Sequence, residues 1–430
     1  MMELRLPQVS ARLSAAAQAS GEPLCAYVYD LEALRRHAMH LAASLPPRCD
    51  LFYAIKANSE LPLLRTLAPV VHGFEVSSGG ELAWIGEHFA GRPVIFSGPG
   101  KTDAELSAAV ARRVDCLHVE SLLEMQRLAH ILEREDRQQG VLLRINLPLD
   151  QLAETTLVMG GKPTPFGIPA EQLAECLAWL HDFPRLQLRG FHFHLMSHQL
   201  DAQRHLAMLE ACLAKVAEWR ERFGLAIDHI NLGGGIGINY REPERQFDWE
   251  AFSAGLAELV ARRLPDDLRL RFELGRYMTA ACGYYAMQVI DIKRSYGKTF
   301  AVGRGGTHHF RTPQAQGHSH PFHVVPVDAW PHSYQRPAAV AGKVNVVGQL
   351  CTPKDLLAFD APVEALRVGD LVVFPYAGAY GWHISHHDFL RHPPPEQLFL
   401  PSNAPLIVGA SLAKAGECHP QHMLDDIVVS

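Results

Sequence analysis

Two ionisable residues lie in apolar runs that read as buried strands, where a charged side chain is unusual. Lys56 ends the apolar run LFYAIK, and Glu273 lies within RLRFELGR. Desolvation should lower the pKa of such a lysine, which suits formation of an imine with an aldehyde; the alternative is a structural lysine paired with a carboxylate. Glu273 could keep a pyridine ring protonated, or it could form an ion pair with Arg276.

The run NLGGGIG contains Gly233, Gly234 and Gly235, whose backbone could approach an anion closely. A dinucleotide-binding loop would need an acid about 20 residues further on, and Glu242 and Glu244 come too early. A tight structural turn remains an equal alternative.

His194 lies in HFHLMSHQ and could stack on a flat ring. His192 and His198 beside it raise the possibility of a metal site, but no carboxylate or cysteine completes the set at a familiar spacing, so we expect no metal. The tract GHSHPFH (His318, His320, His323) is expected to be a solvated loop.

Short apolar runs alternate with helical periodicity from residue 51 to about residue 273. Eight such units predict a (β/α)₈ TIM barrel, with a doubly wound sheet as the structural rival. In a barrel the active site lies at the carboxyl ends of the strands. The polar residues expected there are Lys56, Glu75, Ser97, Glu120 with Ser121, Arg144 with Asn146, His194, the three glycines, and Glu273 with Arg276.

After about residue 280 the helical periodicity fades, and β-rich runs punctuated by Pro, Gly and His follow. This half predicts an antiparallel β domain, in which residues 303–337 form a long loop. We therefore expect an N-terminal segment over residues 1–30 that packs with the β domain, a barrel over 31–275, and the β domain over 276–430. The first 20 residues predict an amphipathic helix and not a signal peptide.

Composition narrows the class of protein. The chain has 430 residues, 48% of them hydrophobic and 20% charged, with a net charge of −6. This balance, without a basic block, gives no reason to expect nucleic acid as a partner. Eight scattered cysteines form no C-x-x-C pair, which argues against a zinc module or a disulfide framework. No apolar run approaches the roughly 18 residues of a membrane span. We expect a cytoplasmic protein.

Taken in order, eight motifs resemble the fold-type III pyridoxal 5'-phosphate (PLP) enzymes, the family of the ornithine and diaminopimelate decarboxylases. The resemblance covers roughly residues 25–415. The motifs are FYAIKAN, GFEVSSGGEL, FGI at 166–168, HFHLMSH, NLGGGIG, ELGR, GQLCTPKD and GAYG. Fold type III implies an alanine racemase-like barrel with a C-terminal β domain.

The resemblance implies a role for each matching residue. Lys56 would hold PLP as a Schiff base with Glu75 nearby, His194 would stack on the ring, and Glu273 would hold the pyridinium. Those expected around the phosphate are Ser197, Gly233, Gly234, Gly235, Arg276 and Tyr380. Cys351 would reach the active site of a partner subunit in a homodimer and help to protonate the product, together with His194 or Lys56. By itself, an isolated cysteine is more often a small buried hydrophobe.

One departure bears on the substrate. The position after the cysteine is acidic in typical members, where it helps to bind a distal ammonium, but here it is Thr352. A buried ammonium without a carboxylate would be costly, so ornithine, lysine and free diaminopimelate should be poor substrates. The sequence also reads ELGR where the family usually has Glu-Pro-Gly-Arg.

A neutral or anionic distal group fits better. Arg144, Thr352 and Lys354 are candidate substrate contacts, and Arg304 and Arg311 could meet carboxylates. GQLCTPKDLLA and SLAKAGECHPQHML resemble the siderophore branch, whose members decarboxylate citryl-linked L-2,3-diaminopropionate in staphyloferrin B assembly.

Four alternatives stay open at this point. The chain could decarboxylate diaminopimelate or another amino acid. It could be a racemase on the same fold, although similar alanine racemases place an arginine where Glu273 stands. It could be a non-catalytic PLP-binding protein, but those proteins lack the C-terminal half. An unrelated nicotinamide-dependent barrel enzyme is the fourth.

Overall fold

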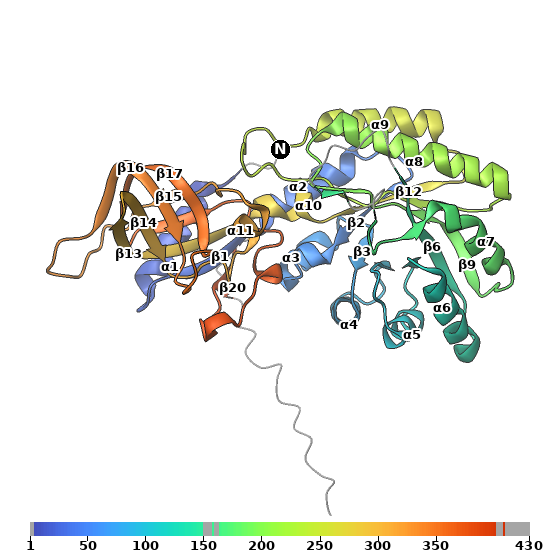
Figure 1. The fold of residues 1–430 in the computed structure, drawn as a ribbon, viewed down its shortest axis with the longest axis horizontal. Helices are drawn as coiled ribbons and strands as arrows, with labels where there is room; N and C mark the ends of the chain where they lie inside the picture. The colour runs from blue at the N-terminus through green and yellow to red at the C-terminus, as the bar shows by residue number, and fades with distance from the viewer. Residues whose placement is uncertain (1–3, 149–156, 159–162, 401–406, 409–430) are drawn as a thin grey trace, which may run out of the picture.

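In the computed structural model, which describes residues 4–148, 157–158, 163–400 and 407–408, the chain folds into a barrel and a separate, mostly antiparallel sheet (Figure 1). The eight parallel strands of the barrel close because β12 pairs with β2 and β5 pairs with β6. Their bounds are β2 Cys49–Ala54, β3 Gly73–Val76, β4 Val94–Phe96, β5 Cys116–Val119, β6 Gln139–Asn146, β9 Leu186–His192, β11 His229–Asn231 and β12 Arg269–Leu274. The predicted barrel is confirmed, and the doubly wound alternative is wrong.

Helices cover the outside of the barrel (Figure 1). They are α2 Leu31–Ser44, α3 Leu61–Leu67, α4 Gly79–His88, α5 Asp103–Ala111, α6 Leu122–Glu135, α7 Leu173–His181, α8 Ala202–Phe223 and α9 Trp249–Arg263. Several begin at a side chain that caps the first turn: Ser78 accepts from Glu81 N, and Thr102 forms a capping box with Glu105. Such a cap fixes the residue at which the preceding strand-to-helix loop ends.

The second sheet has the order β17-β16-β14-β13-β1-β19-β20, with β18 paired to both β13 and β15. Its strands are β1 Cys25–Asp30, β13 Gly283–Ser295, β14 Lys298–Gly303, β15 His323–Val325, β16 Ala338–Val347, β17 Leu356–Arg367, β18 Leu371–Phe374, β19 Glu396–Leu400 and β20 Ile407–Val408. The predicted amphipathic helix is present as α1 (Leu6–Ala19), which buries Val9 and Leu13 against this sheet. The division at residues 30 and 275 stays a prediction.

Shorter elements complete the description. They are α10 Arg276–Thr279, α11 Thr312–Gln316, β7 Leu157–Val158 paired with β10 Met196–Ser197, β8 Ile168–Pro169, and the 3₁₀ turns η1 Ile55–Ala57, η2 Ala170–Gln172, η3 Ala280–Cys282, η4 Trp382–Ile384 and η5 Phe389–Arg391. Residues 303–337 were expected to form one long loop, but they contain α11 and β15. The expectation missed Pro313, whose fixed φ favours the first turn of a helix.

The histidine tract was also misjudged. His318 and His320 are 6% and 1% exposed, so the expected solvated loop is wrong for both, whereas His323 is exposed at the start of β15. Each of the two buried rings packs against aromatic neighbours, among them Tyr240. Burial among aromatic rings removed these polar side chains from water, which composition alone does not reveal.

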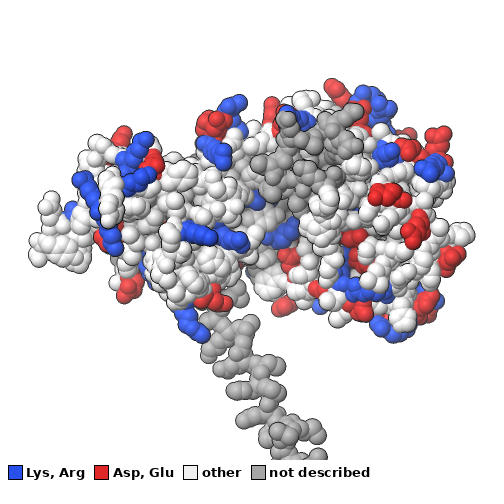
Figure 2. Space-filling view, viewed as in Figure 1, with Lys and Arg blue, Asp and Glu red and all other residues white. Residues whose placement is uncertain are grey.

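The mixed charge of the composition is also visible on the surface of the molecule. On the face drawn in Figure 2, acidic and basic side chains are interspersed over the barrel. None of the helices in the described ranges combines the length and the apolar character that crossing a bilayer requires.

A small cluster of buried side chains joins four strands of the barrel: Phe52 on β2, Ile95 on β4, Cys116 on β5 and Leu142 on β6. Leu142→Ala should leave a cavity there and lower the free energy of unfolding by about 2–5 kcal/mol, measured as a shift of the urea midpoint. Leu123→Ala is the control, because Leu123 is 63% exposed and its truncation should change stability by less than about 0.5 kcal/mol. Equal shifts in the two variants would contradict this packing.

Candidate active site

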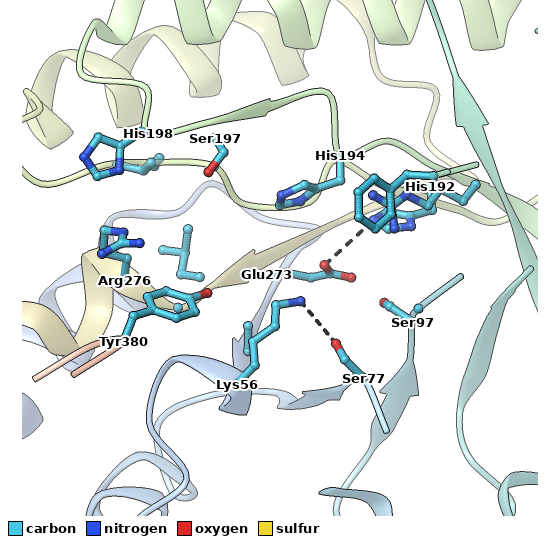
Figure 3. A pocket seen from close by; sticks show the side chains of 18 of the residues that line it. Lys56, Ser77, Ser97, His192, His194, Ser197, His198, Glu273, Arg276 and Tyr380 are labelled. Carbon is cyan, nitrogen blue, oxygen red and sulfur yellow. Dashed lines mark hydrogen bonds and ion pairs between the residues drawn. The ribbon is translucent and has the colours of Figure 1, made fainter. Parts of the chain in front are cut away.

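A cavity of about 440 Å³ opens at the carboxyl ends of the barrel strands (Figure 3). Eight of the predicted site residues line it: Lys56, Arg144, His194, Ser197, Gly235, Glu273, Arg276 and Tyr380. Tyr380 comes from the C-terminal half, so side chains far apart in sequence enclose one space. The polar strand ends therefore meet, as the barrel geometry predicted.

Lys56 lies in η1, the turn that directly follows β2, and its amine faces the cavity. Its Nζ donates to both oxygens of Glu75, at 3.0 and 2.9 Å, and to Ser77 Oγ at 3.3 Å. Ser77 Oγ in turn donates to Glu75 Oε1 at 2.8 Å. Glu75 is fully buried beneath the lysine. These contacts hold the amine at a fixed point of the cavity wall.

The pKa of Lys56 differs from the sequence expectation. Desolvation lowers the pKa of this amine, but the negative charges of Glu75 and Glu273 outweigh it and hold the pKa above its ordinary value. The expected depression is therefore wrong for the amine as it stands here. The resemblance placed Glu75 near Lys56, but the strand sequence alone could not weigh the effect of that charge on the pKa, because Glu75 lies 19 residues away and meets Lys56 through the pairing of β2 with β3.

Glu273 is the second buried carboxylate of the cavity. Asn231 Nδ2 donates to its Oε1 at 2.8 Å, and His118 Nδ1 and His192 Nε2 lie 3.5 and 3.7 Å from its oxygens. Burial and the charge of Glu75 raise its pKa, which favours a shared or bound proton at this carboxyl. In the described part of the chain no ion pair joins Glu273 to Arg276, so that alternative is wrong.

The histidines of the site are neutral. Burial, reinforced by nearby cations such as Arg144, lowers the pKa values of His118, His192 and His194 well below the ordinary value. Gly234 N donates to His194 Nδ1 at 3.4 Å, which places the proton of that ring on Nε2. A neutral ring beside the cavity can stack on an aromatic face without adding charge.

One group of residues could by spacing hold a metal ion. Ligand atoms of His118, His192 and Glu273 lie within 4.8 Å of one another, and all three residues are buried. Of the three neighbouring histidines that suggested a metal site in the sequence, only His192 belongs to this group. The other two members, His118 and Glu273, come from β5 and β12. The same three groups equally suit a protonated ring nitrogen held by Glu273.

The glycine run allows close backbone packing. Gly233 and Gly235 have φ of +65° and +84°, and a Cβ on Gly234 would collide with the carbonyl oxygen of Glu273. A Cβ on Gly235 would collide with the carbonyl of Met196. Gly235 lines the cavity, whereas Gly233 and Gly234 pack behind it. The run thus serves as a tight turn that also brings backbone to the cavity.

Arg276 marks the other end of the cavity, beside Ser197 and Tyr380 (Figure 3). Its guanidinium lies 4.4 Å from the centre of the Tyr380 ring, and its Nη1 donates to Tyr240 Oη at 2.8 Å. A basic group, a hydroxyl and glycine backbone at one end of a cavity are suited to a phosphate.

Arg144 also lines the cavity, but it is paired: its Nη1 donates to Glu120 Oε1 at 2.9 Å, and its guanidinium lies 4.9 Å from the Phe166 ring centre. The predicted residues of the GQLCTPKD motif do not line this cavity. Cys351 and Lys354 are exposed and Thr352 is partly exposed, all in the loop between β16 and β17.

Sequence reasoning missed several lining or supporting residues: Ser77, His118, Asn231 and Tyr240. His118 and Asn231 lie within β5 and β11 and point into the barrel, where an apolar residue would be the default. A buried polar residue in a strand was the available signal.

The residues present fit PLP. An amine, a buried carboxyl and a guanidinium stand at separate points of one cavity, and the neutral His194 ring lies between them. His192, 1% exposed and lining the cavity, has no hydrogen-bond partner on either ring nitrogen within the described residues. The backbone of Gly235 completes the lining.

Comparison with known proteins gives the family. Residues 31–280 match the model of the pyridoxal-binding domain of pyridoxal-dependent decarboxylases. The chain is 44% identical over 386 residues to 2-[(L-alanin-3-ylcarbamoyl)methyl]-2-hydroxybutanedioate decarboxylase of Staphylococcus aureus, covering 89% of this chain and 96% of that one. It is 31% identical over 382 residues to L-glutamyl-[BtrI acyl-carrier protein] decarboxylase of Niallia circulans, covering 86% and 87%.

A solved structure agrees. Diaminopimelate decarboxylase of Helicobacter pylori, complexed with L-lysine, superposes with a TM-score of 0.80 at 25% identity, covering 92% of this chain and 95% of that one. The fold predicted from the motifs is confirmed.

The contact between Lys56 and Glu75 leads to a prediction. Glu75→Gln removes the charge that stabilises the ammonium, so cofactor-free protein should expose a reactive Lys56 amine at about one to three pH units lower than the wild type. The measurement is acetylation of Lys56 against pH, read by peptide mass. Glu60→Gln, which removes a carboxylate paired with His383, is the control and should leave that profile in place. An unchanged profile in Glu75→Gln would refute the electrostatic argument.

Proposed function

Since this chain belongs to the pyridoxal-dependent decarboxylase family, we propose that it removes the α-carboxylate from an amino acid whose distal end is an amide-linked hydroxydicarboxylic acid. PLP is the cofactor, and the reaction class is that of a carboxy-lyase. The observation that carries the proposal is the shared cavity of Lys56, Glu273 and Arg276. When bound, the cofactor accepts the electron pair that departing CO₂ leaves at the α-carbon.

Each residue has a role in this reaction. Lys56 would attach the cofactor and, once displaced by the substrate amine, stand near the α-carbon as a proton carrier. Glu273 would hold the proton on the ring nitrogen, and Asn231 orients that carboxyl. His194 would lie against the ring face. Ser197, the backbone of Gly233, Gly234 and Gly235, Arg276 and Tyr380 would surround the phosphate.

Glu273 favours decarboxylation over racemisation. As a carboxylate opposite the ring nitrogen, Glu273 would keep that nitrogen protonated, and a cationic ring would stabilise the negative charge that forms at the α-carbon. Because His118 and His192 are neutral, neither repels that cation. These histidines therefore add no positive charge to the site.

Cys351 is proposed to act in the cavity of a second copy of the chain. It is exposed and lies outside the cavity of its own barrel, while the buried Asp355 fixes its loop by accepting from Thr307 N at 2.6 Å and Leu350 N at 2.8 Å. A fixed, exposed thiol suits protonation of a product across an interface. We therefore propose a homodimer with shared sites.

The chemistry of this loop supports a substrate without a distal cation. Asp355 is the one carboxylate within residues 349–355, and backbone amides occupy it. Thr352 stands beside Cys351, and Lys354 is exposed. Arg304, which donates to Gln349 Oε1 at 3.0 Å, adds a second cation at the base of the loop. Such surroundings disfavour an ammonium and suit carboxylates.

The relatives support the same substrate class. The name of the Staphylococcus aureus relative describes an amino acid joined through an amide to a hydroxybutanedioate, and that of the Niallia circulans relative describes a glutamyl carrier protein. Neither distal group is cationic. We propose the first compound, citryl-linked L-2,3-diaminopropionate, as the substrate, in assembly of a siderophore similar to staphyloferrin B.

The cytoplasm is the proposed compartment. Seven cysteines in the described residues are free thiols, which supports a reducing environment.

Substrate choice can be measured directly. Purified enzyme should release CO₂ from citryl-linked diaminopropionate with a kcat/KM at least about 100-fold above that for meso-diaminopimelate or L-ornithine, because the loop offers no free carboxylate to a distal ammonium. Lys56→Ala should release none and lose the visible absorbance of the bound cofactor. Thr352→Asp is the matched variant and should shift the preference toward L-ornithine. Turnover of diaminopimelate alone would reverse the assignment.

The shared site predicts complementation. Lys56→Ala and Cys351→Ala homodimers should each be strongly impaired, whereas mixed and reassociated subunits should regain about a quarter of wild-type activity, since half of the dimers are mixed and each holds one complete site. The measurement is CO₂ release after subunit exchange. If Cys351 acted within its own chain, mixing would give only the mean of the two variants.

A further inference from the structure

The buried histidines His318 and His320 pack against Tyr240, which follows the glycine run. The His318 and Tyr240 rings are stacked, with centres 5.0 Å apart and planes 11° apart, and His320 lies tilted at 5.2 Å. Tyr240 is 4% exposed. On its other sides lie His198 at 6.0 Å and the edge of Tyr376 at 6.5 Å. Four rings from three segments of the chain thus pack around one tyrosine ring.

Hydrogen bonds fix the two histidines in turn. His320 Nε2 lies 2.7 Å from the carbonyl oxygen of Pro375, which can only accept, so Nε2 carries the proton. Burial holds the pKa of His320 at about 3 and that of His318 at about 4, so both rings are neutral. His320 Nδ1 must then accept, and His318 Nε2, 2.9 Å away, donates to it. The pair is anchored to the residue that follows β18.

Tyr240 connects the two histidines to a residue that lines the cavity, Arg276. Its hydroxyl accepts from Arg276 Nη1 at 2.8 Å, and the Tyr380 ring lies 4.4 Å from the same guanidinium. Arg276 has no carboxylate within ion-pair distance among the described residues. A carboxylate there would neutralise the guanidinium and compete with an anionic ligand, whereas a tyrosine hydroxyl orients it and leaves its charge available.

We propose that Tyr240, braced by the His318–His320 pair, is a positioning residue that aims Arg276 at the phosphate of the cofactor. The inference rests on the proposed function, in which that phosphate occupies the end of the cavity formed by Ser197, Gly235 and Arg276. It adds that the C-terminal half controls phosphate affinity through a residue that does not line the cavity. The gain is a guanidinium held in one orientation before the ligand arrives.

The test compares PLP with pyridoxal, which lacks the phosphate. Tyr240→Phe keeps the ring and removes the hydroxyl. In titrations of the full-length, cofactor-stripped enzyme, it should weaken PLP binding by about tenfold, equal to about 1.4 kcal/mol, and leave pyridoxal binding unchanged. Tyr376→Phe is the matched control, because its hydroxyl lies 3.5 Å from the Pro243 carbonyl and away from Arg276. It should change neither affinity.

A second variant keeps the inference falsifiable if Tyr240→Phe is poorly folded, as judged by circular dichroism. His318→Leu removes the stacked, hydrogen-bonded ring while leaving the Tyr240 hydroxyl in place, and it should also lower the ratio of PLP to pyridoxal affinity. The ³¹P resonance of bound PLP should shift in both variants.

Two failures are distinguishable. A wild-type enzyme that binds PLP and releases CO₂, with variants whose affinity ratio and ³¹P resonance are unchanged, would overturn the positioning role alone. A wild-type enzyme that neither binds PLP nor releases CO₂ would overturn the proposed function and the positioning role with it.

Discussion

Closure of the eight-stranded barrel is the constraint on which the site depends. Because β12 pairs in parallel with β2, Glu273 lies opposite Phe52 and Leu274 opposite Tyr53, so the ends of the last and first strands meet. The pairing of β2 with β3 sets Glu75 opposite Ala54, two residues before Lys56. Backbone hydrogen bonds at fixed register therefore bring an amine and two carboxyls to one opening.

The charged side chains at that opening have different kinds of partners. Lys56 forms an ion pair with Glu75, and Arg144 forms one with Glu120. Glu273 instead accepts a hydrogen bond from the side-chain amide of Asn231. Burial keeps the surrounding histidines neutral, so they add shape without charge. Burial and the charge of Glu75 consequently hold the pKa of Glu273 above the ordinary value of a carboxyl.

The C-terminal half contributes residues to the site itself. Tyr380 lies in the cavity wall, and its backbone N–H donates to the carbonyl of Ala57 at 2.8 Å, next to Lys56. The buried His318–His320 pair reaches Arg276 through Tyr240. The barrel alone provides Lys56 and Glu273. The end of the cavity that contains Arg276 is formed by residues of both halves of the chain.

The sequence by itself determined the barrel, the β-rich second half, the family and part of the cavity lining, including Lys56 and Glu273, because strand periodicity and ordered motifs are local patterns. Only the tertiary structure decided the charge state of Lys56, the burial of His318 and His320, and the contact of Tyr240 with Arg276. Each of these arises between residues distant in the chain, where desolvation and partner charges depend on packing. No local pattern encodes which distant side chain will stand within 3 Å of another.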